Sequence, residues 1–361
     1  MTDSTIPFAV VGAGWRASFF LRVAEAMPER LRVTGVLARD RERVAPIAGG
    51  APIPVHASLD ALLADGPRFV VVAVPWAATP VLVRELASRG VPVLAETPPA
   101  PDLAGLNAIL DLARRPPVPI EVAEQYHLQP LHAARLAVVA SGALGTVSQA
   151  HVSAAHGYHG IDLLRRYLGV RFGRVQIRAR RYSSPIVAGP DRAGPPPEER
   201  IAVSEQTLAW LDFEGRLGVH DFTGDQYFSW IRSPRVLVRG ERGEINDATV
   251  RRLVDARTPV TETLERRDAG RDGNLEGFHH SGYTLGGRWV YRNPTAPARL
   301  ADDEIAVAGC LLSMAERVEG GPSRCSLADA AWDHELGLRV AEAAATGREV
   351  VADGGRWASS D

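Results

Sequence analysis

The chain has 361 residues, of which 45% are hydrophobic and 23% are charged. Its 41 basic residues are all arginine, and with 43 acidic residues they leave a formal net charge of -2. Because the sequence contains no lysine, chemistry that needs an ε-amino group of this chain is excluded, including Schiff-base formation and a lysine general acid. Arginine cannot replace lysine as a proton donor near neutral pH, because its guanidinium stays protonated.

The length of the chain exceeds the roughly 250–300 residues at which a single core stops growing, so two domains are expected. A near-neutral charge argues against nucleic acid as the main partner, because nucleic-acid-binding proteins usually present a basic surface. The two cysteines, Cys310 and Cys325, have no metal-ligand spacing and fit a reducing compartment. No signal-peptide pattern precedes Ile6 and no run of about 18 apolar residues occurs, which predicts a cytoplasmic protein without membrane association.

Short apolar runs alternate with helical patterns in the N-terminal third of the chain. The predicted strands are 6–11, 31–38, 69–74, 91–95 and 120–123. The predicted helices between them are 19–27, 59–63, 80–88 and 103–113. Strands that alternate with helices form a parallel sheet with helices on both faces, so this part is an α/β domain.

Strand-like segments follow one another without intervening helices after about Gln125. They are 146–153, 175–181, 207–213, 217–222 and 235–239. The proline-rich stretch 188–199 is predicted as a loop, and 302–319 and 326–346 as late helices, the second ending near Gly347. The pattern therefore predicts an α/β domain over residues 1–125 and an α+β domain with an open, mainly antiparallel sheet over residues 126–361.

The turn after the first predicted strand is rich in glycine. Its sequence is Gly12-Ala13-Gly14-Trp15-Arg16-Ala17. In a strand–turn–helix context the first glycine permits the tight turn, the second lets a pyrophosphate approach the backbone, and a small third residue allows close packing. The turn predicts dinucleotide binding at a helix N-terminus, with a tight turn that holds no ligand as the alternative.

The end of the second predicted strand bears on the choice of dinucleotide. An NAD site usually has Asp or Glu about 20 residues after the glycine turn, where it accepts hydrogen bonds from the ribose hydroxyls. Here the strand ends with Ala38, Arg39 and Asp40. A cation at Arg39 suits a 2′-phosphate and favours NADP over NAD, whereas a shift of one residue would bring Asp40 into the acidic position. A third interpretation makes Arg39 an ordinary surface residue.

Further segments resemble one family of enzymes. They are 69–76, 90–98 with its Glu96-Thr97-Pro98 ending, 159–162 with the sequence His-Gly-Ile-Asp, and 291–294 followed by 302–306. Together with the glycine turn, this ordered set is similar to the Gfo/Idh/MocA oxidoreductases over almost the whole chain.

The resemblance implies an N-terminal Rossmann domain and a second domain whose open sheet forms homodimers or homotetramers. It also implies NADP or NAD as the cofactor, and a small carbohydrate-like molecule or natural-product intermediate as the substrate, oxidised or reduced at a carbinol carbon. Carried over position by position, the residues around the cofactor are Gly12, Gly14, Trp15, Arg16, Arg39, Pro75, Trp76, Glu96, Thr97, Pro98 and Gln125.

The expected catalytic set departs from the family pattern. The family usually has lysine where this chain has Thr97, and aspartate where it has Ala155. His159 is retained and is the leading candidate for acid–base catalysis, because an imidazole can exchange the hydroxyl proton that accompanies hydride transfer. His156 and Tyr158 are further catalytic candidates, with a structural role as the alternative for each histidine. Asp162 begins a helical pattern, so it is expected either to cap or orient that helix or to take part in the chemistry.

Three functions remain open on these residues. The first is an NAD(P)-dependent oxidoreductase in which His159 acts as the only acid–base group. The second is a redox-neutral lyase, epimerase or rearrangement enzyme that uses bound NAD(P) transiently. The third is a non-catalytic protein that retains the dinucleotide site.

Other histidines carry weaker signals. His279 and His280 are adjacent, and neighbouring side chains diverge in regular structure, so no metal site is predicted there. His334 lies within a predicted helix between two acidic residues and is expected on the helix surface or at an interface.

Overall fold

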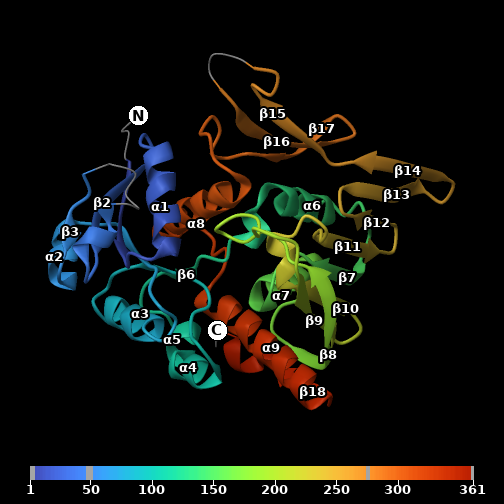
Figure 1. Ribbon diagram of the computed structural model, residues 1–361, viewed down its shortest axis with the longest axis horizontal. Coiled ribbons are helices and arrows are strands. Elements are labelled where there is room, and N and C mark those ends of the chain that lie inside the picture. The colour runs from blue at the N-terminus through green and yellow to red at the C-terminus, as the bar shows by residue number, and fades with distance from the viewer. Residues whose placement is uncertain (1–4, 46–51, 274–276, 359–361) are drawn as a thin grey trace.

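The N-terminal part of the chain forms a parallel sheet, as predicted. The computed structural model describes residues 5–45, 52–273 and 277–358, and within them six strands join in the order β3-β2-β1-β4-β5-β6 (Figure 1). All five neighbouring pairs are parallel. The strands are β1 (Ile6–Val11), β2 (Leu31–Leu37), β3 (Val55–His56), β4 (Phe69–Val72), β5 (Val93–Ala95) and β6 (Ile120–Val122).

Helices cover both faces of this sheet. One face packs against α1 (Trp15–Ala26) and also against α8 (Asp302–Val318), which comes from the far end of the chain. The other face packs against α2 (Leu59–Ala64), α3 (Thr79–Ser88), α4 (Leu103–Ala108) and α5 (Leu110–Arg114). The predicted helix 103–113 is therefore two short helices that meet at Ile109.

The second sheet is mainly antiparallel, which confirms the prediction. Nine strands of the described chain join in the order β14-β13-β12-β11-β7-β10-β9-β8-β18, and only the β7–β10 pair is parallel. The strands are β7 (Val147–Ser153), β8 (Arg174–Val187), β9 (Ile201–Asp212), β10 (Leu217–Thr223), β11 (Arg235–Gly240), β12 (Gly243–Asn246), β13 (Thr249–Asp255), β14 (Thr258–Thr263) and β18 (Val350–Asp353).

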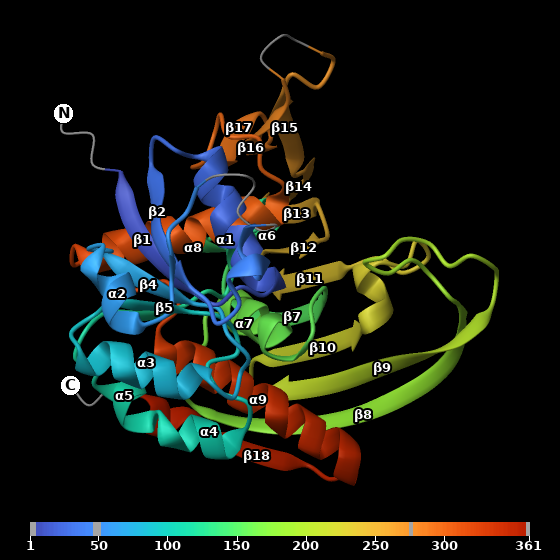
Figure 2. The same ribbon diagram turned by 60° about the vertical axis from the view of Figure 1, so that its left-hand side comes forward.

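Helices α7 (Gly157–Leu168) and α9 (Leu327–Thr346) pack on one face of the second sheet (Figure 2). Helix α9 begins after the capping Ser326 and ends at Gly347 in the left-handed conformation, as the sequence predicts. Strands β8 and β9 are longer than predicted because their outer ends carry polar residues that break the apolar pattern.

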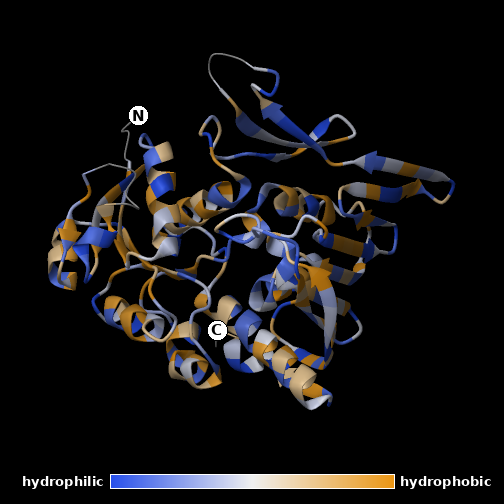
Figure 3. Ribbon diagram, viewed as in Figure 1, coloured by the Kyte–Doolittle hydropathy of each residue, from blue (hydrophilic) through white to orange (hydrophobic). Residues whose placement is uncertain are grey.

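The remaining elements flank the two sheets. Helix α6 (Pro130–Ala140) follows the last Rossmann strand, and a small antiparallel sheet contains β15 (Glu265–Ala269), β16 (His279–Leu285) and β17 (Arg288–Arg292). The colouring by hydropathy shows the mixed character of these outer strands (Figure 3). No helix in the described ranges combines the length and apolar character that a membrane span requires.

The turn between β1 and α1 depends on a glycine that tolerates no side chain. Gly12 has a φ of 121°, and a Cβ added there would lie 2.1 Å from the carbonyl oxygen of Ala73, at the end of β4. The Gly12 amide donates a hydrogen bond of 2.9 Å to the carbonyl of Leu37. The close approach of these three strand ends therefore requires glycine at this position.

Substitution of this glycine should destabilise the protein. We expect Gly12→Ala to lower the free energy of unfolding by about 2–4 kcal/mol, because it adds a backbone clash to an unfavourable φ. Gly90→Ala is the matched control: Gly90 has a φ of 75° but no described atom lies within 4 Å of an added Cβ. Its cost should be about 1 kcal/mol. Urea unfolding followed by circular dichroism measures both, and equal losses would contradict the clash.

Candidate active site

The carboxyl ends of β1 and β4 form the point where the strand order of the parallel sheet reverses. In open α/β sheets, ligands bind in the crevice at this point. The glycine turn follows β1 and the segment that contains Pro75 and Trp76 follows β4. Trp15 and Trp76 are each 52% exposed, so two large aromatic side chains border this edge of the sheet.

The start of α1 has the features of a phosphate-binding turn. Gly14 is the N-cap of α1, and no side chain caps the helix. The first turn of α1 contains no acidic residue. A Cβ added to Gly14 would meet no described atom within 4 Å, so the backbone here borders open space. Uncapped amides and an open approach fit a dinucleotide pyrophosphate.

Arg16 connects three of the predicted cofactor-binding segments. Its Nε and Nη2 donate to Glu96 Oε1 at 3.0 and 2.8 Å, and Nη2 also donates to Gln125 Oε1 at 2.9 Å. Glu96 follows β5 and Gln125 follows β6. The structure therefore brings the glycine turn and the ends of two further strands together, as the resemblance implies.

Thr97 and Pro98 adjoin this cluster. The Thr97 amide donates to Glu96 Oε2 at 3.2 Å, and the Thr97 side chain lies within hydrogen-bonding reach of Tyr158. The peptide bond between Thr97 and Pro98 is cis. Thr97 thus links the cofactor crevice to the residues of α7.

The end of β2 carries the residues that bear on NADP or NAD. Arg39 is exposed, whereas the preceding Ala38 is buried. Asp40 is already engaged, because its carboxylate accepts from the amide of Glu42 at 3.1 Å and pairs with Arg43 at 3.4 Å. Asp40 is therefore a local cap in this structure.

A loop of the second domain reaches the glycine turn. The predicted loop 188–199 connects β8 to β9, and its Arg192 guanidinium lies 4.0 Å from the centroid of the Trp15 ring. This distance allows a cation–π contact between the two domains at the edge of the cofactor crevice.

Helix α7 begins earlier than predicted. His156 is its N-cap and Gly157 its first residue, so Tyr158 and His159 lie in the first turn. Asp162 lies inside the helix, and the expectation that it caps the helix is wrong. The apolar run after Asp162 predicted a helix start at Asp162. In the structure the backbone is extended at His156, so the helix begins at Gly157.

His159 is held by a carboxylate that the sequence analysis did not identify. Its Nδ1 lies 2.6 Å from Glu124 Oε2, and both side chains are buried. Glu124 lies two residues beyond the end of β6, the last Rossmann strand, and its other oxygen accepts from the Tyr126 amide at 3.0 Å. The rings of Tyr126 and Tyr158 lie 4.6 and 4.4 Å from the His159 ring, centroid to centroid.

A second histidine–carboxylate pair lies beside the first. His127 Nδ1 is 2.9 Å from Asp162 Oδ2, and Arg166 Nε donates to Asp162 Oδ1 at 2.7 Å. Asp162 therefore contacts His127 and Arg166 in the interior rather than facing a ligand. Both pairs connect the segment after β6 to α7.

His156 belongs to a more exposed aromatic group. Its Nδ1 lies 2.6 Å from the hydroxyl of Tyr227, which also lies 3.4 Å from the hydroxyl of Tyr126. Tyr227 comes from the short helix that follows β10. No feature of the sequence pointed to Tyr227, because its segment has no periodic pattern.

The protonation of these groups follows from their burial. Burial raises the pKa of Glu124 to about 8, and the charge of Asp162 adds to the rise. Burial lowers the pKa of His159 to about 3 and that of His156 to about 4. Burial alone would raise the pKa of Asp162, but Arg166 and His127 hold it below its usual range. At neutral pH Glu124 is therefore protonated and His159 is neutral, so this pair carries no net charge.

The structure also places two further histidines considered in the sequence, His334 and His280. His334 is buried, and its ring packs edge-on against Tyr158 at 5.4 Å between centroids, so the predicted surface position is wrong. Helix α9 contacts both α7 and the α4–α5 pair, which leaves little of this helix exposed. His280 Nδ1 lies 2.8 Å from Asp268 Oδ1, and the described residues contain no cluster of three potential metal ligands.

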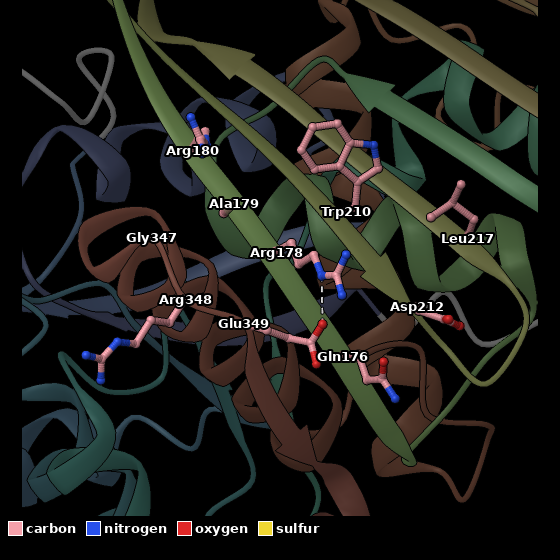
Figure 4. A pocket seen from close by; sticks show the side chains of 10 residues that line it. All are labelled: Gln176, Arg178, Ala179, Arg180, Trp210, Asp212, Leu217, Gly347, Arg348 and Glu349. Atoms are coloured by element: carbon pink, nitrogen blue, oxygen red, sulfur yellow. Dashed lines mark hydrogen bonds and ion pairs between the residues drawn. The ribbon is translucent and has the colours of Figure 1, made fainter.

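A separate depression lies on the outer face of the second sheet. It has a volume of about 640 Å³ and is bordered by β8, β9, β10 and the end of α9 (Figure 4). Arg178 Nε and Glu349 Oε2 form an ion pair of 2.7 Å in it, and Trp210 lies beside them. None of the candidate cofactor or catalytic residues lines this depression.

Comparisons with known proteins agree with this geometry. Residues 6–124 match the GFO_IDH_MocA family, described as an oxidoreductase family with an NAD-binding Rossmann fold. The chain is similar to the myo-inositol dehydrogenase Hyg17 of Streptomyces leeuwenhoekii, at 34% identity over 140 residues. This match spans 38% of the chain and 42% of that protein, so less than half of either sequence is covered.

Solved structures extend the similarity to both domains. An oxidoreductase from Agrobacterium radiobacter, in complex with NAD+, L-tartaric acid and magnesium, is 19% identical with a TM-score of 0.67 over 98% of this chain and 99% of that one. A levoglucosan dehydrogenase in complex with NADH and levoglucosan is 17% identical with a TM-score of 0.67 over 96% and 99%. At these identities the likeness concerns the fold. The sequence match thus assigns residues 6–124 to the GFO_IDH_MocA oxidoreductase family, and the solved structures share the two-domain fold of the whole chain.

Proposed function

We propose that this protein is an NAD(P)-dependent oxidoreductase that acts on a hydroxyl or carbonyl carbon of a sugar, polyol or related metabolite. The observation that carries the proposal is the buried contact between His159 and Glu124 beside the crevice, 2.6 Å long. A neutral imidazole with one nitrogen engaged by a carboxyl group is suited to exchange a proton through its other nitrogen.

The residues of the crevice divide into binding and proton-transfer groups. The backbone at Gly12 and Gly14 fits the pyrophosphate, and Arg16 holds the strand ends beside it through Glu96. When bound, the nicotinamide ring accepts or donates the hydride. Because Glu124 engages Nδ1 of His159, Nε2 is the nitrogen left to take the hydroxyl proton of an alcohol or to return it to a carbonyl oxygen.

Neighbouring side chains would orient the substrate. Tyr158 packs against His159, and His156 and Tyr227 are joined by a hydrogen bond beside it. Burial keeps the pKa of Tyr158 above its usual value, so its hydroxyl stays protonated and can donate a hydrogen bond. We assign these residues to substrate positioning, with His159 as the acid–base group.

The relatives support a carbohydrate-like substrate. One related sequence is named a myo-inositol dehydrogenase, and one similar structure contains levoglucosan with NADH. A redox-neutral reaction, such as an elimination or epimerisation, is the second candidate, because Thr97 stands where the family usually has a lysine. A change in the absorbance of reduced nicotinamide with added cofactor separates the two: it accompanies dehydrogenation, whereas a redox-neutral reaction gives product without it.

We also propose that the outer face of the second sheet pairs with a second copy of the chain. Tyr182 and Trp210 are exposed on adjoining strands of this face, at 50% and 47%. Arg178, Arg180 and Glu349 surround Trp210 and can supply a polar rim. Such pairing fits a homodimer or homotetramer.

Removal of the imidazole tests the catalytic assignment. We expect His159→Ala to lower kcat by about 10²–10⁴-fold, the usual contribution of general acid–base catalysis, while dinucleotide affinity changes little. His279→Ala, in the small β16 strand, is the control and should retain kcat. Steady-state kinetics and fluorescence titration with NADH and NADPH give the two quantities. Near-normal turnover by His159→Ala would refute the assignment.

Arg39 tests the preference for NADP. Loss of a charged hydrogen bond to a 2′-phosphate should weaken NADPH binding about tenfold and leave NADH binding unchanged. Arg39→Ala is compared with Arg32→Ala, a second exposed arginine at the other end of β2. Tight NADH binding by the unmodified protein, with no effect of Arg39→Ala on NADPH, would assign the site to NAD.

A charge on the outer sheet face tests the pairing. Trp210→Glu should halve the mass of the assembly in solution, because it places a carboxylate at the centre of the contact. Val81→Glu is the control on the exposed side of α3, where Val81 is 67% exposed. Light scattering after size-exclusion chromatography measures both masses, and an unchanged mass for Trp210→Glu would place the interface elsewhere.

A further inference from the structure

We infer that Glu124 positions His159 and is the final acceptor of the substrate proton. The chain contains no lysine that could take this role. The inference rests on the proposed oxidoreductase function and adds a second member to its proton-transfer group. It assigns a function to a buried carboxyl group that lies two residues beyond the end of β6.

The geometry fixes one orientation of the His159 ring. Glu124 Oε2 lies 2.6 Å from Nδ1, and Glu124 Oε1 is anchored by the Tyr126 amide at 3.0 Å. The Tyr126 and Tyr158 rings pack against the imidazole from the η3 segment (Tyr126–Leu128) and from α7. With Nδ1 held in this way, the ring presents Nε2 for proton exchange.

The surroundings disfavour an ion pair between an ionised Glu124 and a protonated His159. Both side chains are buried, and burial disfavours a charge on either one. The described titratable or charged groups that face the pair come from six elements or strand ends. They are Arg16 on α1, Glu96 after β5, Tyr126 and His127 on η3, His156, Tyr158, Asp162 and Arg166 at the start of or within α7, Tyr227 on the short helix after β10, and Cys310 on α8.

These surroundings favour a relay without separated charge. In alcohol oxidation the substrate O–H bond breaks and a proton binds His159 Nε2. The Nδ1–H bond then breaks and its proton binds the Glu124 carboxylate, while the hydride leaves the carbinol carbon for the nicotinamide. The imidazole ends neutral, with its proton moved from one nitrogen to the other. Carbonyl reduction runs the same steps in reverse, from protonated Glu124.

The relay predicts a specific pH dependence. Because the pKa of Glu124 is raised to about 8, the carboxylate needed for oxidation accumulates as the pH rises through that value. The kcat/KM for oxidation should rise through about pH 8, and that for reduction should fall over the same range. Replacement of Glu124 by glutamine should remove this limb from both profiles.

Glu124→Gln is the main test variant, because it keeps the size of the side chain but cannot take up a proton. We expect kcat to fall about 10–100-fold with little change in KM or in dinucleotide affinity. Glu124→Asp retains a carboxyl group and should have a higher kcat than Glu124→Gln, with the pH limb restored in part. This variant provides the test if Glu124→Gln folds poorly. Asp268→Asn is the matched control, since Asp268 and His280 form a buried pair of 2.8 Å outside the site.

Infrared spectroscopy of the cofactor-free protein provides a readout independent of turnover. The carbonyl stretching band of a protonated carboxyl group should disappear as the pH rises through about 8 in the unmodified protein. Because burial also raises the pKa of Asp333 to about 8, Glu124→Gln should lose only the Glu124 part of this change, whereas Asp268→Asn should retain all of it.

The outcomes separate the inference from the proposed function. Unmodified protein that neither binds a dinucleotide nor turns over polyols would overturn the proposed function, and with it a relay to substrate. Active protein whose Glu124→Gln variant keeps kcat and the pH limb would overturn the inference alone. An infrared change of undiminished amplitude in Glu124→Gln would also overturn it, by showing that Glu124 contributes no titrating carboxyl group.

Discussion

The candidate active site depends on one constraint, the free-energy cost of burying ionisable groups where the two domains meet. The end of β6 supplies Glu124 and His127, and α7 supplies His159 and Asp162. Each acidic group meets a histidine of the other segment, so two contacts fix α7 against the Rossmann sheet. A buried carboxyl or imidazole without a partner would cost several kcal/mol, and the pairing avoids that cost.

The two pairs differ in how they satisfy this constraint. Arg166 bonds to Asp162 and stabilises its carboxylate, so Asp162 and Arg166 form a structural ion pair beside His127. Among the described residues, no arginine hydrogen-bonds to Glu124 or His159, and both members of this pair favour their neutral forms. Similar residues thus give one pair that anchors the helix and one that, in the proposed reaction, moves a proton.

Much of the fold could be predicted from the sequence because its signals are local. Apolar runs gave the strands of the parallel sheet, and Gly12 and Gly14 gave the turn between β1 and α1. The start of α7 was missed because an extended N-cap at His156 has no marker in the periodic pattern. The outer strands, such as β13 and β14, carry many charged or polar residues and so lack the alternation that identifies a half-buried strand.

The site could be predicted only where one segment carries the signal. His159 and the cofactor residues were found through motifs, but the partners of His159 and His156 come from segments distant in the sequence. Glu124 could have been suspected, because it follows a parallel strand at the edge where ligands bind. Tyr227 could not, since only the folding of the second sheet brings its helix beside α7.

The late position of α8 in the chain has a consequence for synthesis. One face of the Rossmann sheet is covered jointly by α1 and by α8, which begins only at Asp302. At typical elongation rates, α8 leaves the ribosome on the order of tens of seconds after α1. During that interval the apolar residues that α8 covers remain exposed to solvent or to a chaperone. The N-terminal domain therefore cannot complete its folding first, although it is translated first.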